Sequence, residues 1–314
     1  MASMILFPAE VLTPRQIRHE TLRVAVIQKL EDALDIQTDG RIEFKIRESW
    51  NRDPDEDEDV DTPVHESRTR FEPFKDIYKR RFMWYYESYF ATVQQNMDEY
   101  KDGTKFEIMP FEHGGNVMEG KFVYSELGKR LIRIKEAINE ETNRWAEDAI
   151  AAKQRDTTKF HNLQRAWARF EEQQKSGGIP NVSVELDNNN PSIWILTYFG
   201  KPSTDLEGGV FRIRVSLSLN FPEEQPRVRI ETPVYHHRVS KDGILCYFPD
   251  PMKLGNMTSH ILAIVDVLED ESPPYDPRTI VNAEASKLMW GSTDDKKKYK
   301  RQVRRSAQRS VEDE

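Results

Sequence analysis

Residues 193–219 read IWILTYFGKPSTDLEGGVFRIRVSLSL, and this stretch decides the fold of the second half of the chain. The run from Ile193 to Phe199 is rich in aromatic and β-branched residues and stops at Gly200. After Gly208-Gly209, every second position is apolar, at Phe211, Ile213, Val215, Leu217 and Leu219. A period of two is typical of a strand with one buried face. The stretch therefore predicts two consecutive strands joined by a loop that ends in glycines.

Further strands and helices are predicted on both sides of this pair. Residues 182–186 alternate before it, and residues 227–231 alternate after it. Helical spacing precedes the strands, with Phe160, Leu163, Trp167 and Phe170 on one side of a helix, and it returns over residues 257–269 and 281–290. A helix, a four-stranded antiparallel meander and C-terminal helices make an α+β domain.

The first half of the chain reads as helical. Apolar residues repeat at helical spacing over residues 17–34, over the aromatic-rich residues 71–100, and again from Ser125 onwards. Asp156-Thr157-Thr158 is the best place for a helix to end and a new one to begin with an N-cap. We therefore expect an all-α domain at 1–150 with an acidic insert at 53–61, a second domain at 156–305, and a charged tail at 306–314.

Composition excludes several classes of function. The 314 residues carry 46 Lys and Arg against 54 Asp and Glu, a net charge of -8, which argues against binding nucleic acid through bulk electrostatics. No apolar run is long enough to span a bilayer, and the first residues lack the basic region of a secretory signal. A single cysteine fits a reducing compartment, so we expect a cytoplasmic or nuclear protein. No histidine pairing of the HExxH kind and no Gly-rich phosphate loop occurs, so neither a metal nor another cofactor is expected.

The single cysteine is Cys246, and two interpretations of it stay open. An isolated thiol is by default a small buried hydrophobic group. Here, however, a β-rich segment runs into a turn at Gly243 and delivers the thiol at its end, before a Pro-rich loop. That placement suits a nucleophile that carries an acyl group as a thioester.

The second half of the chain resembles the ubiquitin-conjugating (UBC) domain family over residues 156–305. The resemblance consists of seven motifs in family order: Trp194 and Gly200, Thr204 with Gly208-Gly209-Val210-Phe211, Phe221-Pro222 with Pro226, Tyr235-His236, Gly243, Cys246, and Asn282-Ala283-Glu284-Ala285. It implies the UBC fold and a two-step acyl transfer. Cys246 would accept ubiquitin or a ubiquitin-like modifier from an activating enzyme, which uses the ATP, and would then pass it to an amine, with or without a ubiquitin ligase.

The resemblance also assigns catalytic residues, with one departure from the family. The family motif HPN aligns with His236-His237-Arg238, so Arg238 stands where the family has the asparagine that supports the oxyanion or braces the loop. Arg238 either supplies donors in its place or points to solvent. Asp276 occupies the position of the acid that orients and deprotonates the incoming lysine, or it only starts a Pro-containing turn. Tyr275 would pack on the methylene groups of that lysine.

Partner surfaces follow from the same resemblance. Lys159, Arg165 and Arg169 form a basic helix face that would meet the activating enzyme, although a merely solvated face has the same pattern. Phe221, Pro222 and Pro249 fall in the loops that family members present to ligases. After the cysteine, Leu254 replaces a frequent tryptophan.

The first half resembles the helical extension of the large Z-type ubiquitin-conjugating enzymes, over residues 17–26 and 122–134. There the extension follows the UBC domain, whereas here it precedes one. Either the architecture is rearranged, or this is the remainder of a tandem protein, or the first half is an ordinary helical accessory domain. For the second half, the leading hypothesis is an active conjugating enzyme. A non-catalytic module that binds ubiquitin or scaffolds a ligase is the alternative, and an RWD-type scaffold is a third.

Overall fold

The computed structural model describes residues 75–105 and 121–312, together with residues 27, 30–32, 34 and 36. The predicted acidic insert at 53–61 and the residues 17–26 that resemble the Z-type extension lie outside the described residues. The second block of that resemblance, residues 122–134, falls on the first turns of a long helix.

Two long helices, α3 (Lys75–Glu99) and α4 (Tyr124–Gln154), form what we call the helical hairpin. Apolar side chains recur three and four residues apart on both helices, and the hairpin buries them in a core that also includes Cys246 and Val281 from later in the chain. That core includes Phe82 and Val93 of α3 with Leu131 and Ile134 of α4, all at most 1% exposed. An ion pair between Lys79 and Glu141 links the two helices. The helices predicted for residues 71–100 and from Ser125 are confirmed.

A sharp break separates the hairpin from the rest of the chain. Asp156 takes a left-handed conformation (φ 51°), which ends α4. Thr157 then caps α5 (Thr158–Ser176), because its hydroxyl accepts from the Phe160 amide at 3.3 Å. The break is where the sequence predicted it. The boundary set at residue 150 is too early, since α4 continues to Gln154.

The second part, residues 158–312, is built on a four-stranded antiparallel sheet, and we call it the sheet domain. Its strands β1 (Val182–Leu186), β2 (Ile193–Phe199), β3 (Val210–Ser216) and β4 (Arg227–Ile230) pair in chain order. Trp194 of β2 pairs with Val215 of β3, and its side chain lies on the inner face of the sheet. The centroid of its ring is 4.8 Å from that of Trp167 and 5.1 Å from that of Phe170, both on α5. Helix α6 (Met257–Glu269) packs on the same core through Ile261 and Ile264.

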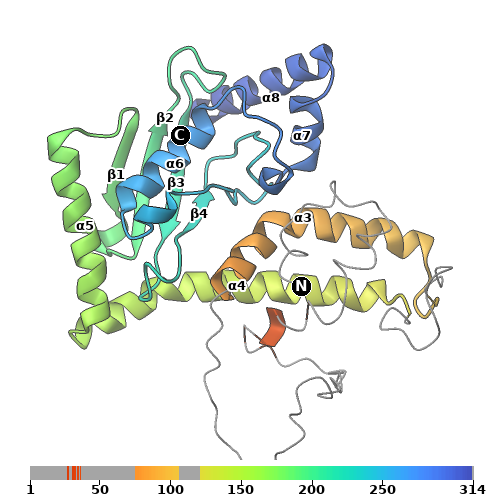
Figure 1. Cartoon of the computed structure of the whole chain (residues 1–314), viewed down its shortest axis with the longest axis horizontal. Helices are drawn as coiled ribbons and strands as arrows, with labels where there is room; N and C mark the ends of the chain where they lie inside the picture. Colours follow the sequence, from red (N-terminus) through yellow and green to blue (C-terminus); the bar gives the residue numbers. More distant parts are fainter. Residues whose placement is uncertain are drawn as a thin grey trace, which may run out of the picture.

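Two further helices, α7 (Ala283–Met289) and α8 (Thr293–Glu312), complete the sheet domain (Figure 1). The α+β class and the preceding helical part, both predicted, are confirmed. The charged tail proposed for residues 306–314 is corrected, because α8 continues as one helix to Glu312. Val303, Ala307 and Ser310 are buried, and the Ser310 hydroxyl accepts from the Val210 amide at 2.9 Å. Short 3-10 turns lie at Asp187–Asn189, Pro251–Lys253 and Pro277–Thr279.

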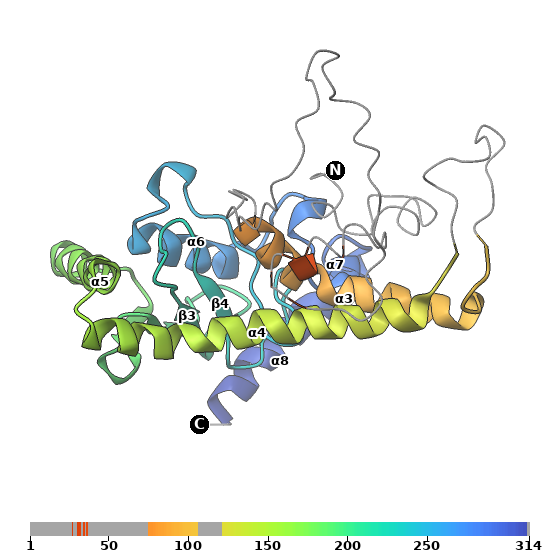
Figure 2. The ribbon, with the colours of Figure 1, turned by 90° about the horizontal axis from the view of Figure 1, so that it is seen from below.

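The hairpin lies against one end of the sheet domain. In Figures 1 and 2, α4 crosses the end of the sheet at β3 and β4, and α3 runs beside α4. The second half of α4 is joined to the sheet domain: Ala149 belongs to its core, and the guanidinium of Arg227 lies over the Trp145 ring at 5.1 Å. The helices of the described ranges include none long and apolar enough to cross a membrane.

Candidate active site

The backbone turn at Gly243 places Cys246. Gly243 has φ +81°, and a Cβ there would lie 2.1 Å from the Ile230 carbonyl oxygen, so only glycine fits without strain. The Ile230 amide donates to the Gly243 carbonyl at 2.8 Å, and the Cys246 amide donates to the Arg238 carbonyl at 2.9 Å. These bonds tie the segment that ends at Cys246 to β4 on one side and to residue 238 on the other.

His236 and His237 brace this segment from inside. His236 is 4% exposed, and its Nδ1 accepts from the Arg238 amide at 3.1 Å. Burial lowers the pKa of His236 well below its ordinary value, with help from His237 and Arg238. The Tyr299 hydroxyl lies 3.1 Å from His237 Nδ1, and burial lowers the pKa of His237 to about 3. Both imidazoles are therefore neutral near pH 7. His236, predicted as catalytic, makes a structural hydrogen bond to the backbone of Arg238.

The guanidinium of Arg238 lies beside the thiol. It stacks over the Phe248 ring at 5.6 Å, and its charge favours the thiolate of Cys246. Of the two orientations left open by the sequence, the structure has the one directed at the cysteine. A guanidinium in this position can donate to a sulfur or to a developing oxyanion.

The thiol itself is fully enclosed. Cys246 is 0% exposed, and its Sγ lies 3.9 Å from the carbonyl oxygen of Arg278. Burial raises the pKa of Cys246 to about 11, although Arg238, Arg81 and Arg80 each act in the opposite direction. With such a pKa, only about 0.01% of the thiol is ionised at pH 7, against a few per cent for an ordinary cysteine. In this conformation Cys246 is a poor nucleophile.

Helix α3 of the hairpin provides the cover. Cys246 belongs to the same buried cluster as the hairpin core. The indole N–H of Trp84 donates to the Leu245 carbonyl at 3.0 Å, and the ring meets Phe248 edge-on at 5.5 Å. The Tyr85 hydroxyl donates to the Arg278 carbonyl at 2.5 Å. Sequence reasoning missed Trp84 altogether, because nothing in an aromatic-rich helix marks which of its rings reach another domain.

The comparisons with known proteins agree with this geometry. Residues 163–307 match the ubiquitin-conjugating enzyme family. Over 154 residues the chain is 29% identical to ubiquitin-conjugating enzyme E2 7 of Triticum aestivum. The aligned region covers 42% of this chain and 86% of the wheat protein.

The sheet domain is a ubiquitin-conjugating domain. The family resemblance of the second half is thus confirmed. Membership gives this UBC domain a general role in ubiquitin conjugation, a pathway whose partners are ubiquitin, activating enzymes and ligases.

The carboxylate of Asp276 is engaged at the start of a turn in the UBC domain. It accepts from the Arg278 amide at 2.9 Å and forms an ion pair with the Arg278 guanidinium at 2.8 Å. These hydrogen bonds hold the pKa of Asp276 below its ordinary value, which weakens it as a base. Tyr275 is 52% exposed and packs edge-on against Trp290. Its exposed side is the part that an incoming side chain can reach.

The predicted partner residues differ in exposure. Lys159, Arg165 and Arg169 all lie on the exposed side of α5, where Lys159 Nζ donates to Asn220 and Arg165 to Asn162, each at 2.6 Å. Phe221, in contrast, is 5% exposed and packs near the His260 ring, so it supports its loop from within. Pro222 is exposed and Pro249 is half-buried.

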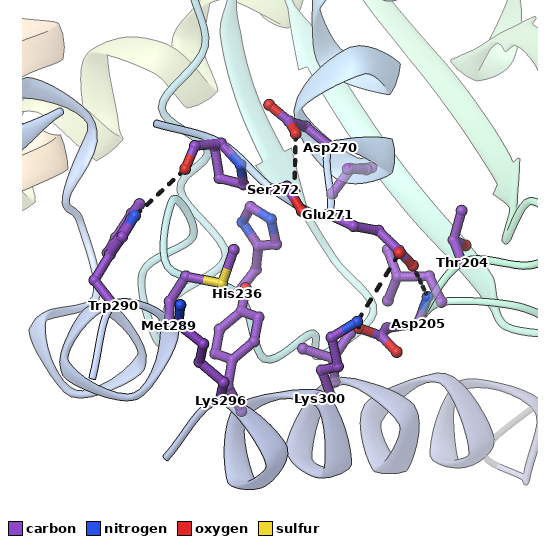
Figure 3. Close-up of a pocket in the computed structure, with 15 residues that line it drawn as sticks. Thr204, Asp205, His236, Asp270, Glu271, Ser272, Met289, Trp290, Lys296 and Lys300 are labelled. Atoms are coloured by element: carbon purple, nitrogen blue, oxygen red, sulfur yellow. Dashed lines mark hydrogen bonds and ion pairs between the residues drawn. The ribbon is translucent and has the colours of Figure 1, made fainter. Parts of the chain in front are cut away.

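A pocket of about 280 Å³ lies on the other side of His236, between the β2–β3 connection, the end of α6 and α8 (Figure 3). Its lining mixes acidic and basic groups, and an ion pair of Lys300 with Glu271 crosses it. Cys246 does not line this pocket, so it is separate from the thiol. Among the described residues, no group of His, Cys, Asp and Glu side chains is arranged to hold a metal ion.

Proposed function

We propose that the UBC domain carries ubiquitin or a ubiquitin-like modifier as a thioester on Cys246 and transfers it to an amine. The position of Cys246 carries this proposal: the thiol sits at the end of the Gly243 turn of a UBC domain, with its amide held by the Arg238 carbonyl. A thiol at the end of a backbone turn that fixes its position can serve as the nucleophile of an acyl transfer.

The proposed reaction consists of two acyl transfers. In the first, the Cys246 thiolate attacks the thioester carbonyl carbon of the modifier bound to its activating enzyme, and the thiolate of that enzyme leaves. In the second, a neutral amine attacks the carbonyl carbon of the new thioester, loses a proton, and expels the Cys246 thiolate. Both steps pass through a tetrahedral oxyanion, which needs nearby donors.

The side chains around the thiol have distinct parts in this scheme. Arg238 offers donors and a positive charge where sulfur becomes negative, because its guanidinium lies beside Cys246. Asp276 is the candidate to orient the amine, once its carboxylate is released from Arg278. The exposed cations of α5 are the proposed contact for the activating enzyme, and a reducing cytosol or nucleus is the proposed location.

Thioester formation is tested by incubating the full chain with an activating enzyme, ATP and ubiquitin or a ubiquitin-like modifier. An adduct that disappears with reductant and is absent from Cys246→Ala supports the proposal. Cys246→Ser is a matched control, since its oxyester resists reductant. If no tested modifier forms an adduct with a folded chain whose thiol accepts a small alkylating reagent, the proposal is wrong.

Two observations favour a second candidate, a non-catalytic module that binds ubiquitin or scaffolds a ligase. The thiol is 0% exposed, and the family asparagine is replaced by Arg238. Binding of unactivated ubiquitin to the Cys246→Ala chain, measured by NMR titration, supports this role if the parent chain forms no adduct.

A further inference from the structure

Helix α3 packs directly on the segment around Cys246. We propose that the helical hairpin is an autoinhibitory cover, which must tilt away from the UBC domain before Cys246 can accept a modifier. This inference rests on the proposed function for the acceptance step, whereas the cover itself is tested without it.

The cover is held at its rim by polar contacts on both sides of the cysteine segment. On one side, Asp76 of α3 pairs with Arg227 of β4 at 2.7 Å. On the other side, Glu87 of α3 accepts from the Lys241 amide at 2.6 Å, and Lys135 of α4 pairs with Asp242. Beneath this rim the contact is apolar, because Cys246 and Val281 share one buried cluster with the hairpin side chains. The polar rim is therefore the part of the contact that opens first, and the apolar centre sets most of the free-energy cost of opening.

The hairpin keeps its own core when it moves. The side chains that join α3 to α4, such as Phe82 and Leu131, are buried between the two helices, and Lys79 pairs with Glu141 across them. Displacing the hairpin from the cysteine therefore exposes Trp84, Tyr85 and the apolar surface around Cys246 and Val281, while the packing of α3 on α4 is kept. A part of the chain that can move as a unit is expected to open at a lower free energy than global unfolding.

The second half of α4 provides the pivot. Ala149 and Trp145 pack against the UBC domain, whereas Lys135, which holds the far rim, lies 14 residues before Ala149. At the helical rise, this separation is about 21 Å, so a tilt of about 15° at the pivot opens a gap of about 5 Å at the rim. Figure 2 shows α4 running beside α3 and continuing past β3 and β4.

Helix α3 also contacts the residues that hold Arg238 in place. Trp84 packs edge-on against Phe248, and Phe248 lies under the Arg238 guanidinium. Departure of α3 removes one support of Phe248, so the aromatic contact that holds Arg238 changes at the same time as the thiol becomes exposed. Opening therefore alters both the access to Cys246 and the position of its nearest cation.

The experiment uses the fact that Cys246 is the only cysteine in the chain, which makes every thiol label unambiguous. The rate of alkylation by iodoacetamide is measured at pH 7.5 on the full folded chain and on the chain unfolded in urea. We expect the folded chain to react at least about a hundredfold more slowly, because reaction requires opening. Equal rates in the two states would overturn the cover.

Three variants probe the rim and the centre of the contact. Lys135→Glu places a carboxylate opposite Asp242 and should speed alkylation by about three- to tenfold. Adding Asp242→Lys restores an opposite-charge pair and should return the rate to within about twofold of the parent. Trp84→Ala should speed alkylation by about a hundredfold or more, since it removes a buried ring and a hydrogen bond. Lys129→Glu is the matched control, because Lys129 is exposed on the same helix and, among the residues that the structure describes, forms its ion pair with Glu126 of that helix.

Two results separate the cover from the proposed function. If Lys135→Glu and the parent react equally while circular dichroism shows both folded, the rim does not hold the cover and the inference fails. If alkylation accelerates and ubiquitin loading by an activating enzyme rises in parallel, both proposals are supported. If alkylation accelerates but no adduct forms, the thioester role is refuted and the cover is not.

Discussion

Replacing Gly243 by alanine should both destabilise the UBC domain and displace Cys246. At φ +81° an alanine costs about 1–2 kcal/mol. Its Cβ would lie 2.1 Å from the Ile230 carbonyl oxygen, and relieving that overlap costs about 1–3 kcal/mol more. The backbone shift also weakens the 2.8 Å bond between Ile230 and Gly243, worth about 0.5–1.5 kcal/mol. The total is about 1.5–6 kcal/mol once the lower entropy of the unfolded alanine chain is allowed for.

The assay is urea denaturation of the full chain, followed by circular dichroism, with Gly208→Ala as the matched control. Gly208 also has a positive φ, +76°, but a Cβ there would meet nothing within 4 Å. The control should therefore lose only about 1 kcal/mol, the cost of the backbone conformation. On heating, Gly243→Ala should melt about 3–24 °C below the parent. Equal losses in the two variants would refute the argument that the Ile230 carbonyl excludes a side chain.

Three other predictions concern the surroundings of the thiol and the domain boundary. Because burial raises the pKa of Cys246 to about 11 in the folded chain, above its unfolded value, the stability contributed by the neutral thiol is complete below pH 8.5. This contribution should fall by about 2–3 kcal/mol as the pH rises to 11. It is measured as the difference in unfolding free energy between the parent and Cys246→Ala at each pH. A difference that stays constant with pH would contradict the prediction. Arg238→Ala should shift the pH profile of Cys246 alkylation to higher pH, since the guanidinium favours the thiolate, whereas Arg238→Lys should shift it less; an unchanged profile in the alanine variant would place the cation away from the sulfur. Thr157→Ala should cost about 1 kcal/mol in urea denaturation by removing the N-cap of α5, and Thr158→Ala, one residue further on, should cost less.

Much of the fold could be predicted because its signals are local. The alternation in residues 210–216 is the pattern of a strand with one buried face, and Thr157 offers the hydroxyl that a helix start needs. The turn at Gly243 and the thiol three residues later are likewise adjacent in the chain. These features depend on backbone geometry within a few residues, so they survive any tertiary arrangement.

The end of the chain shows where local reasoning fails. Residues 306–312 look like a solvated charged tail because most of their side chains are polar. They form the last turns of α8, since Ala307 and Ser310 face the sheet and Ser310 binds the Val210 amide. One or two small side chains at helical spacing are too weak a pattern to reveal that contact without the partner surface.

The sequence by itself determined that this chain has a helical part, a UBC domain, and one cysteine at the end of a glycine turn. Only the tertiary structure decided that the cysteine is closed off and that Arg238 faces it. The reason is that both depend on contacts between distant residues: Trp84 binds the carbonyl of Leu245, a backbone atom that every residue possesses, and Phe248 supports the Arg238 guanidinium. A hydrogen bond to backbone leaves no trace in the identity of the residue that accepts it.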